Sequence, residues 1–310
     1  MYTSSSKTCK TRYIKIKKLK HEFQLFFMLK SPDMQIIDGR KIRDQILGDL
    51  FARVQALPAT PIFCDVLVGD NETSSQYVRM KERIAHSLGI DVLPASYPES
   101  ITTEDLVVEI KRIAAVPRMA GLIVQLPLPE HINTQEVLDA VPVSIDVDAI
   151  GHEAASRFYA DQPEFVFPTA AAILAVLDTL KTDLSSKHIV VLGHGVLVGK
   201  PVAHLLTRRG LRVTSVDSST ANPERIFADA DILICGIGVA NFIKGPMLKP
   251  GVVVIDAGTS EAGDSITGDV DSASLSETAS ILSPVPGGVG PVTVAMLMKN
   301  VVISAERLLK

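Results

Sequence analysis

The sequence predicts an α/β protein with two lobes, each built on a mainly parallel β-sheet. The chain has 310 residues, enough for two domains of ordinary size. From Met34 onward, apolar runs of strand length alternate with amphipathic runs of helix length, which is typical of β-α-β units. In the second half, a glycine-rich turn joins a buried run to a helical one, as in a Rossmann-type domain.

The composition restricts the function classes. The chain carries 31 Lys or Arg and 35 Asp or Glu, a formal net charge of −4, and 46% of its residues are hydrophobic. The apolar fraction argues against a disordered chain, and the mild acidity argues against a protein that holds nucleic acid through its phosphates. Cys9, Cys64 and Cys235 are odd in number and far apart, which fits neither a disulfide framework nor a zinc cluster. We therefore expect small-molecule ligands, no metal and a reducing cytoplasm.

Positive charge is concentrated at the start of the chain. Residues 1–33 carry eight Lys or Arg against two acids, a net charge of +6, whereas residues 34–310 carry a net charge of −10. Such a step is typical of a tail, a targeting segment or a mistaken start. The apolar run at 23–29 is interrupted and too short to span a bilayer. We interpret 1–33 as a basic leader, disordered or not native; an arm for nucleic acid or a membrane is the less favoured alternative.

The first lobe is expected to span residues 34–170. Its strands are predicted at 61–69, 90–95 and 120–125, and its helices at 74–88 and 103–114. A long helix at 170–181 follows Pro168 and Thr169, with Thr169 placed to cap it. We expect this helix to link the two lobes.

The second lobe is expected at residues 171–290. Its strands are predicted at 189–192, 212–216, 231–235, 252–255 and 280–282, and its main helix at 198–209. Ligands of such sheets gather at the carboxyl ends of the strands. The last helix, 291–310, is expected to cross back and complete the first lobe.

The glycine-rich turn of the second lobe predicts a dinucleotide site. Gly193, Gly195 and Gly199 lie where the backbone can approach a pyrophosphate and offer it the N–H groups of a helix start. The third glycine comes one residue late for the usual G-x-G-x-x-G pattern. Asp217 ends the next strand after this turn, where a carboxylate can accept hydrogen bonds from both ribose hydroxyls. The alternative is a tight turn that binds no ligand.

A second unusual segment follows the last predicted strand. Residues 284–291 contain three prolines and three glycines, so they form neither a helix nor a central strand. A fixed loop of this kind exposes backbone N–H and C=O groups to a planar ligand. The alternative is a plain crossover between the lobes.

In the first lobe, Tyr77 and Lys81 lie four residues apart on a predicted helix and therefore share one face. A lysine beside a phenol can share a proton and polarise a carbonyl or a water molecule. For an isolated pair, a solvated lysine beside a half-buried tyrosine is the commoner arrangement. The order of motifs excludes a short-chain dehydrogenase, where the Tyr-Lys pair follows the glycine turn.

Three further polar residues are candidates for ligand contact. Gln125 ends a buried strand, so its side chain is expected at the carboxyl edge of the sheet. Asp146 and Asp148 alternate with apolar residues and would share one side of an extended segment. Either Asp also suits a turn or a cap, the commoner role for a lone Asp. Metal binding is not indicated, because no His or further acid lies nearby at ligand spacing.

Taken in order, these motifs resemble the methylenetetrahydrofolate dehydrogenase/cyclohydrolase (FolD) family over nearly all of residues 34–310. The resemblance is carried by VGDN at 68–71, SQYVRMK at 75–81, GLIVQLPLP at 121–129, DVD at 146–148, VGKP at 198–201, KPGVVVIDAG at 249–258, GDV at 268–270 and PVPGGVGP at 284–291. Several of these motifs would be weak alone, but in this order along the chain they are highly specific.

The resemblance implies two consecutive activities: oxidation of 5,10-methylenetetrahydrofolate to the 5,10-methenyl form with NAD(P), then hydrolysis to 10-formyltetrahydrofolate. It makes 34–170 a catalytic, folate-binding domain and 171–290 an NAD(P)-binding domain. Lys81 matches the essential lysine of the hydrolysis, Tyr77 and Gln125 position it, and Asp148 binds the pterin. Further residues implied to bind the folate are Pro286, Gly287 and Gly288. Those implied to bind the cofactor are Gly193, His194, Gly195, Val198, Gly199, Asp217, Ser218, Gly236 and Thr259. The family also implies a homodimer through the cofactor lobes.

Several departures from the family pattern bear on the ligands. The usual Gly-Arg-Ser of the cofactor turn reads GHG at 193–195, and the usual His at the end of the second strand is Asp217. The family usually uses NADP, but a lost arginine and an added carboxylate disfavour a ribose 2′-phosphate, so the local residues favour NAD. The segments at 145–149, 167–170 and 259–260 also differ from the family, beside the expected folate and nicotinamide.

Two alternatives remain open from the sequence. One is another two-lobed Rossmann enzyme, of the amino-acid or shikimate dehydrogenase type, which would have no use for the loop at 284–291. The other is a non-catalytic binder of folate or a dinucleotide, which is disfavoured because Tyr77, Lys81, Gln125 and Asp148 are all present.

Overall fold

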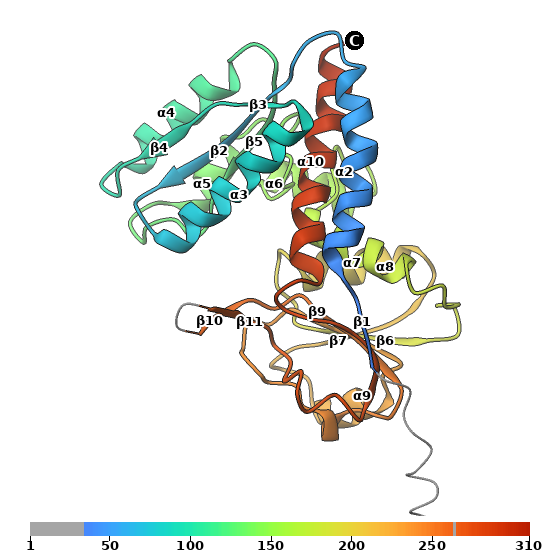
Figure 1. Cartoon of the computed structure of the whole chain (residues 1–310). Helices are drawn as coiled ribbons and strands as arrows, with labels where there is room; N and C mark the ends of the chain where they lie inside the picture. The colour runs from blue at the N-terminus through green and yellow to red at the C-terminus, as the bar shows by residue number, and fades with distance from the viewer. Residues whose placement is uncertain (1–33, 263–264) are drawn as a thin grey trace, which may run out of the picture.

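The computed structural model describes residues 34–262 and 265–310, which form two lobes joined by long helices (Figure 1). The first lobe is built on a four-stranded parallel sheet in which β2 (Ile62–Val68) pairs with β3 (Asp91–Val92), β4 (Ala95–Tyr97) and β5 (Met119–Val124). Its helices are α3 (Glu72–Leu88), α4 (Thr103–Ala114), α5 (Thr134–Asp139) and α6 (His152–Tyr159). The apolar β2 and β5 are buried, as strands of a parallel sheet covered on both faces should be.

The second lobe holds a six-stranded parallel sheet in the order β1-β12-β9-β8-β6-β7. Its strands are β1 (Gln35–Ile36), β6 (His188–Leu192), β7 (Arg212–Val216), β8 (Ile232–Cys235), β9 (Val252–Asp256) and β12 (Ala279–Ser283). Around them lie α8 (Gly199–Arg208), α9 (Pro223–Asp229), the short 3-10 helix η1 (Gly245–Met247) and the hairpin of β10 (Ser260–Ala262) with β11 (Ser265–Thr267).

Three helices join the lobes: α2 (Gly39–Gln55), α7 (Pro168–Asp178) and α10 (Val289–Leu308). Figure 1 shows α2 and α10 side by side, and α10 also packs against α7 and β5. Gly121 of β5 permits this approach, since a Cβ there would lie 2.8 Å from a methyl group of Val301. By length and composition α10 would qualify as a membrane span, but 67% of its apolar window is buried inside the fold. It is therefore a core helix.

The alternation of strands and helices predicted from the sequence is confirmed, with local corrections. The strand predicted at 90–95 is split into β3 and β4, because Pro94 between them offers no N–H to the ladder. Thr169 is not the cap of α7: the helix begins at Pro168, so Thr169 lies inside its first turn. The last helix begins at Val289, ahead of Pro291, which the first turn of a helix tolerates.

Helices α2, α5, α6 and α9, strand β1 and the β10–β11 hairpin were not predicted. Helix α2 presents Ile42, Ile46, Leu50 and Val54 at intervals of four residues to the core, and the other three helices are short. The segment of β1 was assigned to the first lobe within 34–170, but this strand pairs with β12 at the edge of the second sheet. The leader predicted at 1–33, with Cys9, lies outside the described residues.

Candidate functional site

Lys81 lies at the centre of a polar cluster in the first lobe. Asn71 caps α3 by accepting a hydrogen bond from the N–H of Ser74, and the helix then carries Tyr77 and Lys81 one turn apart. The Lys81 side chain is buried, and its Nζ donates a hydrogen bond of 2.8 Å to Oε1 of Gln125. Gln125 follows the last residue of β5, at the carboxyl edge of the sheet. The structure thus brings together Lys81 and Gln125, which come from separate elements of the lobe.

Asp65 joins this cluster and was not anticipated from the sequence. Its Oδ2 lies 2.6 Å from Nζ of Lys81, and its side chain is 0% exposed. Burial raises the pKa of Asp65 to about 6, although the charge of Lys81 acts to lower it. The available signal was a single charged residue within the otherwise apolar strand β2.

Asp146 and Asp148 have different roles. Asp146 is buried, and its carboxylate accepts hydrogen bonds from the N–H groups of Ala149 (3.0 Å) and Gly151 (2.9 Å), so it holds a turn. Asp148, inside that turn, is half-buried and interacts electrostatically with Lys81. Burial raises the pKa of Asp148 to about 6, against the influence of Lys81. Of the two acids, Asp148 is therefore the one associated with the lysine.

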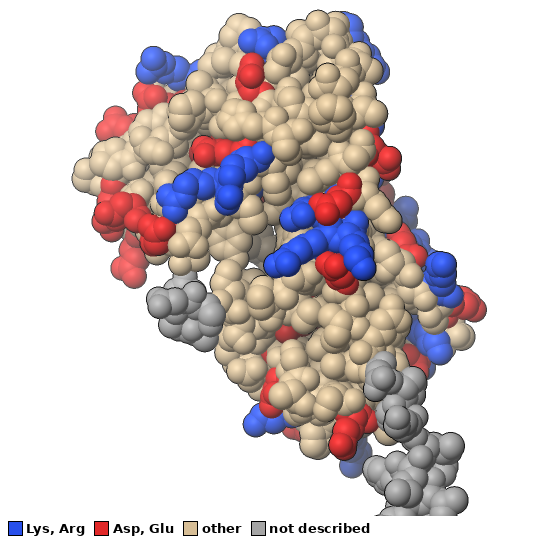
Figure 2. Space-filling model, in the orientation of Figure 1, with Lys and Arg blue, Asp and Glu red and all other residues tan. Residues whose placement is uncertain are grey.

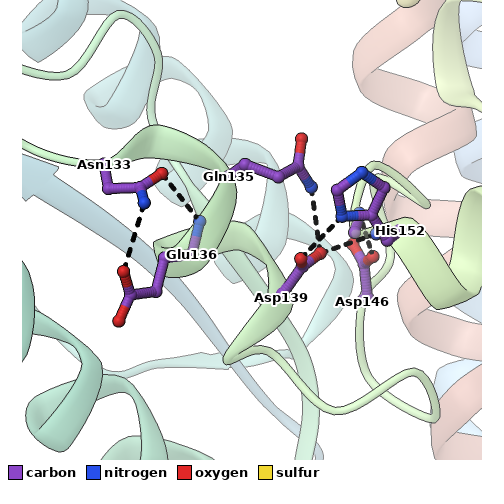
Figure 3. A network of polar contacts seen from close by, with 7 residues as sticks. Asn133, Gln135, Glu136, Asp139, Asp146 and His152 are labelled. Atoms are coloured by element: carbon purple, nitrogen blue, oxygen red, sulfur yellow. Dashed lines mark hydrogen bonds and ion pairs between the residues drawn. The ribbon is translucent and has the colours of Figure 1, made fainter.

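A polar network supports the turn that carries Asp148 (Figure 3). Asp139 at the end of α5 accepts hydrogen bonds from the backbone N–H of His152 (2.7 Å) and from Gln135 (2.9 Å), and it contacts Nδ1 of His152 at 2.7 Å. Asn133 caps α5 through the N–H of Glu136. The network fastens α5 to the first residue of α6, directly after the turn at 146–151.

The glycine turn of the second lobe brings backbone segments into close contact. A Cβ on Gly199 would lie 2.0 Å from the carbonyl oxygen of Gly193, and one on Gly236 would lie 2.7 Å from Cγ1 of Val198. Gly199 thus permits close helix-to-strand packing, although it comes one residue late in the motif. His194 and Gly195 are exposed, and α8 begins without a side-chain cap among the described residues.

Asp217 follows β7 and is exposed together with Ser218. Its Oδ1 accepts hydrogen bonds from the N–H (2.9 Å) and the hydroxyl (2.7 Å) of Ser219 and from the hydroxyl of Thr220 (3.2 Å). The hydrogen bonds from Ser219, with a smaller contribution from His194, hold the pKa of Asp217 below its ordinary value. The carboxylate is therefore ionised and fixed in direction, with Oδ2 outside this set of contacts.

Two buried acids fix the loops that carry Gly236 and Thr259. Asp256, the last residue of β9, accepts hydrogen bonds from the N–H groups of Gly258, Asp269 and Val270. Asp269 accepts hydrogen bonds from the N–H groups of Ile237 (2.6 Å) and Val239 (2.8 Å). Thr259 itself is exposed. The prediction from the sequence missed this pair, although Asp256 and Asp269 belong to the motifs at 249–258 and 268–270.

The loop predicted after the last strand is fixed by backbone contacts. The N–H of Gly288 donates to the carbonyl of Pro284 (2.8 Å), and the N–H of Gly39 donates to the carbonyl of Gly287 (2.9 Å). Pro286 is exposed at its tip. Within residues 34–262 and 265–310, no three His, Cys, Asp or Glu side chains form a group that could hold a metal ion.

Comparison with known proteins agrees with this geometry. The family described as "Tetrahydrofolate dehydrogenase/cyclohydrolase, catalytic domain" matches residues 37–148, and the corresponding "NAD(P)-binding domain" matches residues 168–309. The chain belongs to the tetrahydrofolate dehydrogenase/cyclohydrolase (FolD) family. The bifunctional protein FolD of Lacticaseibacillus paracasei is 38% identical over 275 residues, which cover 87% of this chain and 97% of that protein.

Solved structures of FolD proteins have the same architecture. FolD of Campylobacter jejuni is 32% identical with a TM-score of 0.84, over 88% of this chain and 99% of that one. FolD of Trypanosoma brucei, solved with an NADP cofactor and an inhibitor, is 31% identical with a TM-score of 0.84, over 89% and 98% of the two chains.

The family establishes the activity. The chain is a bifunctional enzyme of one-carbon folate metabolism, a methylenetetrahydrofolate dehydrogenase that uses NAD(P) and a methenyltetrahydrofolate cyclohydrolase. The two alternatives considered from the sequence, another Rossmann dehydrogenase and a non-catalytic binder, are thereby set aside.

Proposed function

We propose that Lys81 is the proton-transferring group of the cyclohydrolase step, that Tyr77 and Gln125 position it, and that Asp148 binds the pterin. The main support is the buried Nζ of Lys81, 2.8 Å from Gln125 and electrostatically coupled to Asp148. A lysine held in this way can give a proton to N5 as the C–N5 bond breaks and take one back from the hydroxyl that the attacking water has left on the methenyl carbon. The pterin of the substrate offers amino and ring N–H donors, which a carboxylate can accept.

The dehydrogenase step makes different demands. The folate nitrogens can stabilise the cation that forms as the hydride leaves, so this step needs the orientation of two ligands more than it needs an acid or a base. When bound, the nicotinamide supplies the hydride acceptor. We assign the cofactor to Gly193, His194, Gly195, Val198, Gly199, Asp217, Ser218, Gly236 and Thr259. We assign the remaining folate contacts to Pro286, Gly287 and Gly288.

The cluster at Lys81 is tested by Lys81→Met, with Lys111→Met as the control, since Lys111 is an exposed lysine on α4 of the same lobe. Lys81→Met should lower hydrolysis of added methenyltetrahydrofolate by at least 100-fold and retain part of the hydride transfer, as expected for removal of a general acid-base group. Lys111→Met should change neither rate. Hydrolysis that survives in Lys81→Met would remove the lysine from its proposed role.

For the cofactor we propose a preference for NAD over NADP. Asp217 is ionised where an adenosine ribose is expected, and a 2′-phosphate there would meet a like charge. Asp217→Ser should shift the ratio of kcat/KM values toward NADP by at least tenfold.

Asp183 provides a matched control for this substitution. Its Oδ1 also accepts hydrogen bonds from the N–H (3.0 Å) and hydroxyl (2.7 Å) of a serine two residues later. It precedes β6, however, at the amino edge of the sheet. Asp183→Ser should leave the NAD/NADP ratio unchanged. An unchanged ratio in Asp217→Ser would refute the argument from charge.

We also propose a homodimer formed through the cofactor lobes, in a cytoplasmic setting. Strand β7 is one of the two outer strands of the sheet that the described residues form, so its free edge suits pairing or packing with a second copy. Cys64 and Cys235 are buried free thiols, in keeping with a reducing compartment. Light scattering of the purified chain would measure its mass; a monomer at micromolar concentration would refute the dimer.

Basic side chains lie close to both proposed ligand sites. Figure 2 shows Lys and Arg near α3 and where the start of α2 meets α7 and α8; α2 begins with Arg40, Lys41 and Arg43, whereas α7 carries no Lys or Arg. Lys200 and His194 line a surface depression together with Tyr159 and His204, beside the glycine turn. Local charge of this kind fits anionic ligands on a chain whose described part is acidic overall.

A further inference from the structure

Asp65 occupies an unusual place for a carboxylate. Strand β2 lies inside its sheet, with β5 on one side and β3 and β4 on the other, and Asp65 is paired in register with Ile123 of β5. The side chain is 0% exposed. A charge in such a position is strongly disfavoured unless an opposite charge accompanies it.

Lys81 supplies the opposite charge. Its Nζ lies 2.6 Å from Oδ2 of Asp65, and neither carboxylate oxygen has a further hydrogen-bond partner among the described residues. The ion pair is therefore the contact that compensates the buried carboxylate. Gln125 contacts the same Nζ at 2.8 Å, so the ammonium group is held by two side chains, Asp65 from β2 and Gln125 directly after β5.

We propose that Asp65 is a positioning residue for the cyclohydrolase step, which compensates the charge of Lys81 and fixes its Nζ beside the folate. This inference rests on the proposed role of Lys81. Gln125 alone is a neutral acceptor, which can orient an ammonium group but carries no charge to compensate it. The carboxylate does both, because its attraction for Lys81 acts across a site with little water.

The proton balance shows what such a lysine can do. Water adds to the methenyl carbon, a C–O bond forms, and one proton leaves to solvent. Nζ of Lys81 then gives a proton to N5 as the C–N5 bond breaks. The hydroxyl of the adduct returns a proton to Nζ as its C=O bond forms, which yields the 10-formyl product. Asp65 remains a carboxylate throughout and stabilises the ammonium group before and after the exchange.

The pH dependence follows from the groups that face Asp65. These are Lys81 and Glu82 on α3, Asp148 on its loop, and the neighbouring thiol of Cys64. Burial sets the pKa of Asp65 at about 6, so below pH 6 the carboxyl takes up a proton and no longer holds the ammonium group. Hydrolysis at saturating folate should therefore decline as the pH falls through 6. The pKa of Asp148 is also about 6. Its contribution to the pH dependence of hydrolysis is the part that remains in a variant without the Asp65 carboxyl.

The test compares Asp65→Asn with the wild-type enzyme, and both activities are measured on the same preparation of each protein. Initial rates of methenyltetrahydrofolate hydrolysis are measured from pH 5 to 8, corrected for the uncatalysed reaction, beside hydride transfer from methylenetetrahydrofolate. We expect the kcat of hydrolysis at pH 7.5 to fall at least tenfold, with its KM and the kcat of hydride transfer within twofold of wild type. The decline below pH 6 should become shallower. Cys64→Ala, at the preceding buried position of β2, should change neither activity.

The outcomes separate this inference from the proposed function. If Lys81→Met abolishes hydrolysis but Asp65→Asn keeps the wild-type kcat and pH profile, the inference about Asp65 is overturned while the role of Lys81 stands. If Asp65→Asn lowers both activities equally, Asp65 is only structural, and the inference is likewise overturned. If that variant does not fold, the wild-type profile decides: a kcat of hydrolysis that is flat from pH 7 to 5 refutes it.

Discussion

Replacing Lys81 by Met should destabilise the folded chain as well as stop hydrolysis. The substitution keeps the length and much of the volume of the side chain, but it leaves the carboxylate of Asp65 buried without its countercharge 2.6 Å away. Removing one partner of a buried ion pair costs about 3–5 kcal/mol, because the remaining charge is left uncompensated. Asp65 limits this cost by binding a proton.

The loss of stability in Lys81→Met depends on pH. With Lys81 present, the pKa of Asp65 is already about 6, above its value in an unfolded chain. Without Lys81 it rises further, because the lysine acts to lower it. A raised carboxyl pKa means that the folded state binds more protons, so stability falls as the pH increases through the folded pKa, by about 1.4 kcal/mol per pH unit. We expect a loss of about 3 kcal/mol at pH 8 and a clearly smaller loss at pH 5.5.

The double variant Lys81→Met/Asp65→Val isolates the cost of leaving the Asp65 carboxylate without its countercharge. It removes both charges and places a β-branched residue in a strand, so its stability should return to within about 1 kcal/mol of wild type or exceed it. Urea unfolding followed by circular dichroism at pH 8 and pH 5.5 gives the free-energy differences. Equal stability of the single and double variants at pH 8 would show that the pair is not coupled as described.

Three further outcomes are expected. Gly199→Ala places a Cβ 2.0 Å from the carbonyl oxygen of Gly193, so the cofactor turn must shift. The KM for the dinucleotide should rise at least tenfold, while hydrolysis of added methenyltetrahydrofolate continues. An unchanged KM would contradict the proposed role of this turn. Arg53→Met removes two hydrogen bonds of 2.8 Å to Glu306 that join α2 to α10, and both side chains are about one third exposed. The free energy of unfolding, measured in urea, should fall by about 1 kcal/mol, and Glu306→Gln should lower it by a similar amount. Burial raises the pKa to about 6 in four carboxyls: Asp65, Asp146, Asp148 and Asp256. Each should therefore add roughly 1 kcal/mol to the free energy of unfolding as the pH falls from 7 to 5. A midpoint of urea unfolding that decreases over this range would contradict these raised pKa values.

The regular elements were predictable where the residues repeat with a clear period. Strands β2, β5, β6 and β9 are mainly apolar runs, and α4, whose buried apolar residues share one face, was predicted with its observed bounds. Strand β1 is too short to show any period, and its place in the second sheet depends on a partner strand near the other end of the chain. Such a contact is invisible to local reasoning.

The polar site was predictable only in part. Tyr77, Lys81, Gln125 and Asp148 stand in recognisable motifs, and Lys81 and Gln125 meet because α3 begins at the edge of the sheet where β5 ends. Asp65 lies in an apolar run that predicts a buried strand, and nothing local reveals that a lysine on the following helix reaches back to it. The acids Asp256 and Asp269 were missed for a similar reason, since their partners are backbone N–H groups of other loops.

The path of the chain between the lobes restricts how they can move against each other. The backbone passes from one lobe to the other after β1, between α7 and β6, and between β12 and α10. The hydrogen bond from the N–H of Gly39 to the carbonyl of Gly287 joins the first of these crossings to the third. The lobes are therefore connected at two places, this paired crossing and the segment at 179–187, and any rotation of one lobe against the other would bend the backbone at both.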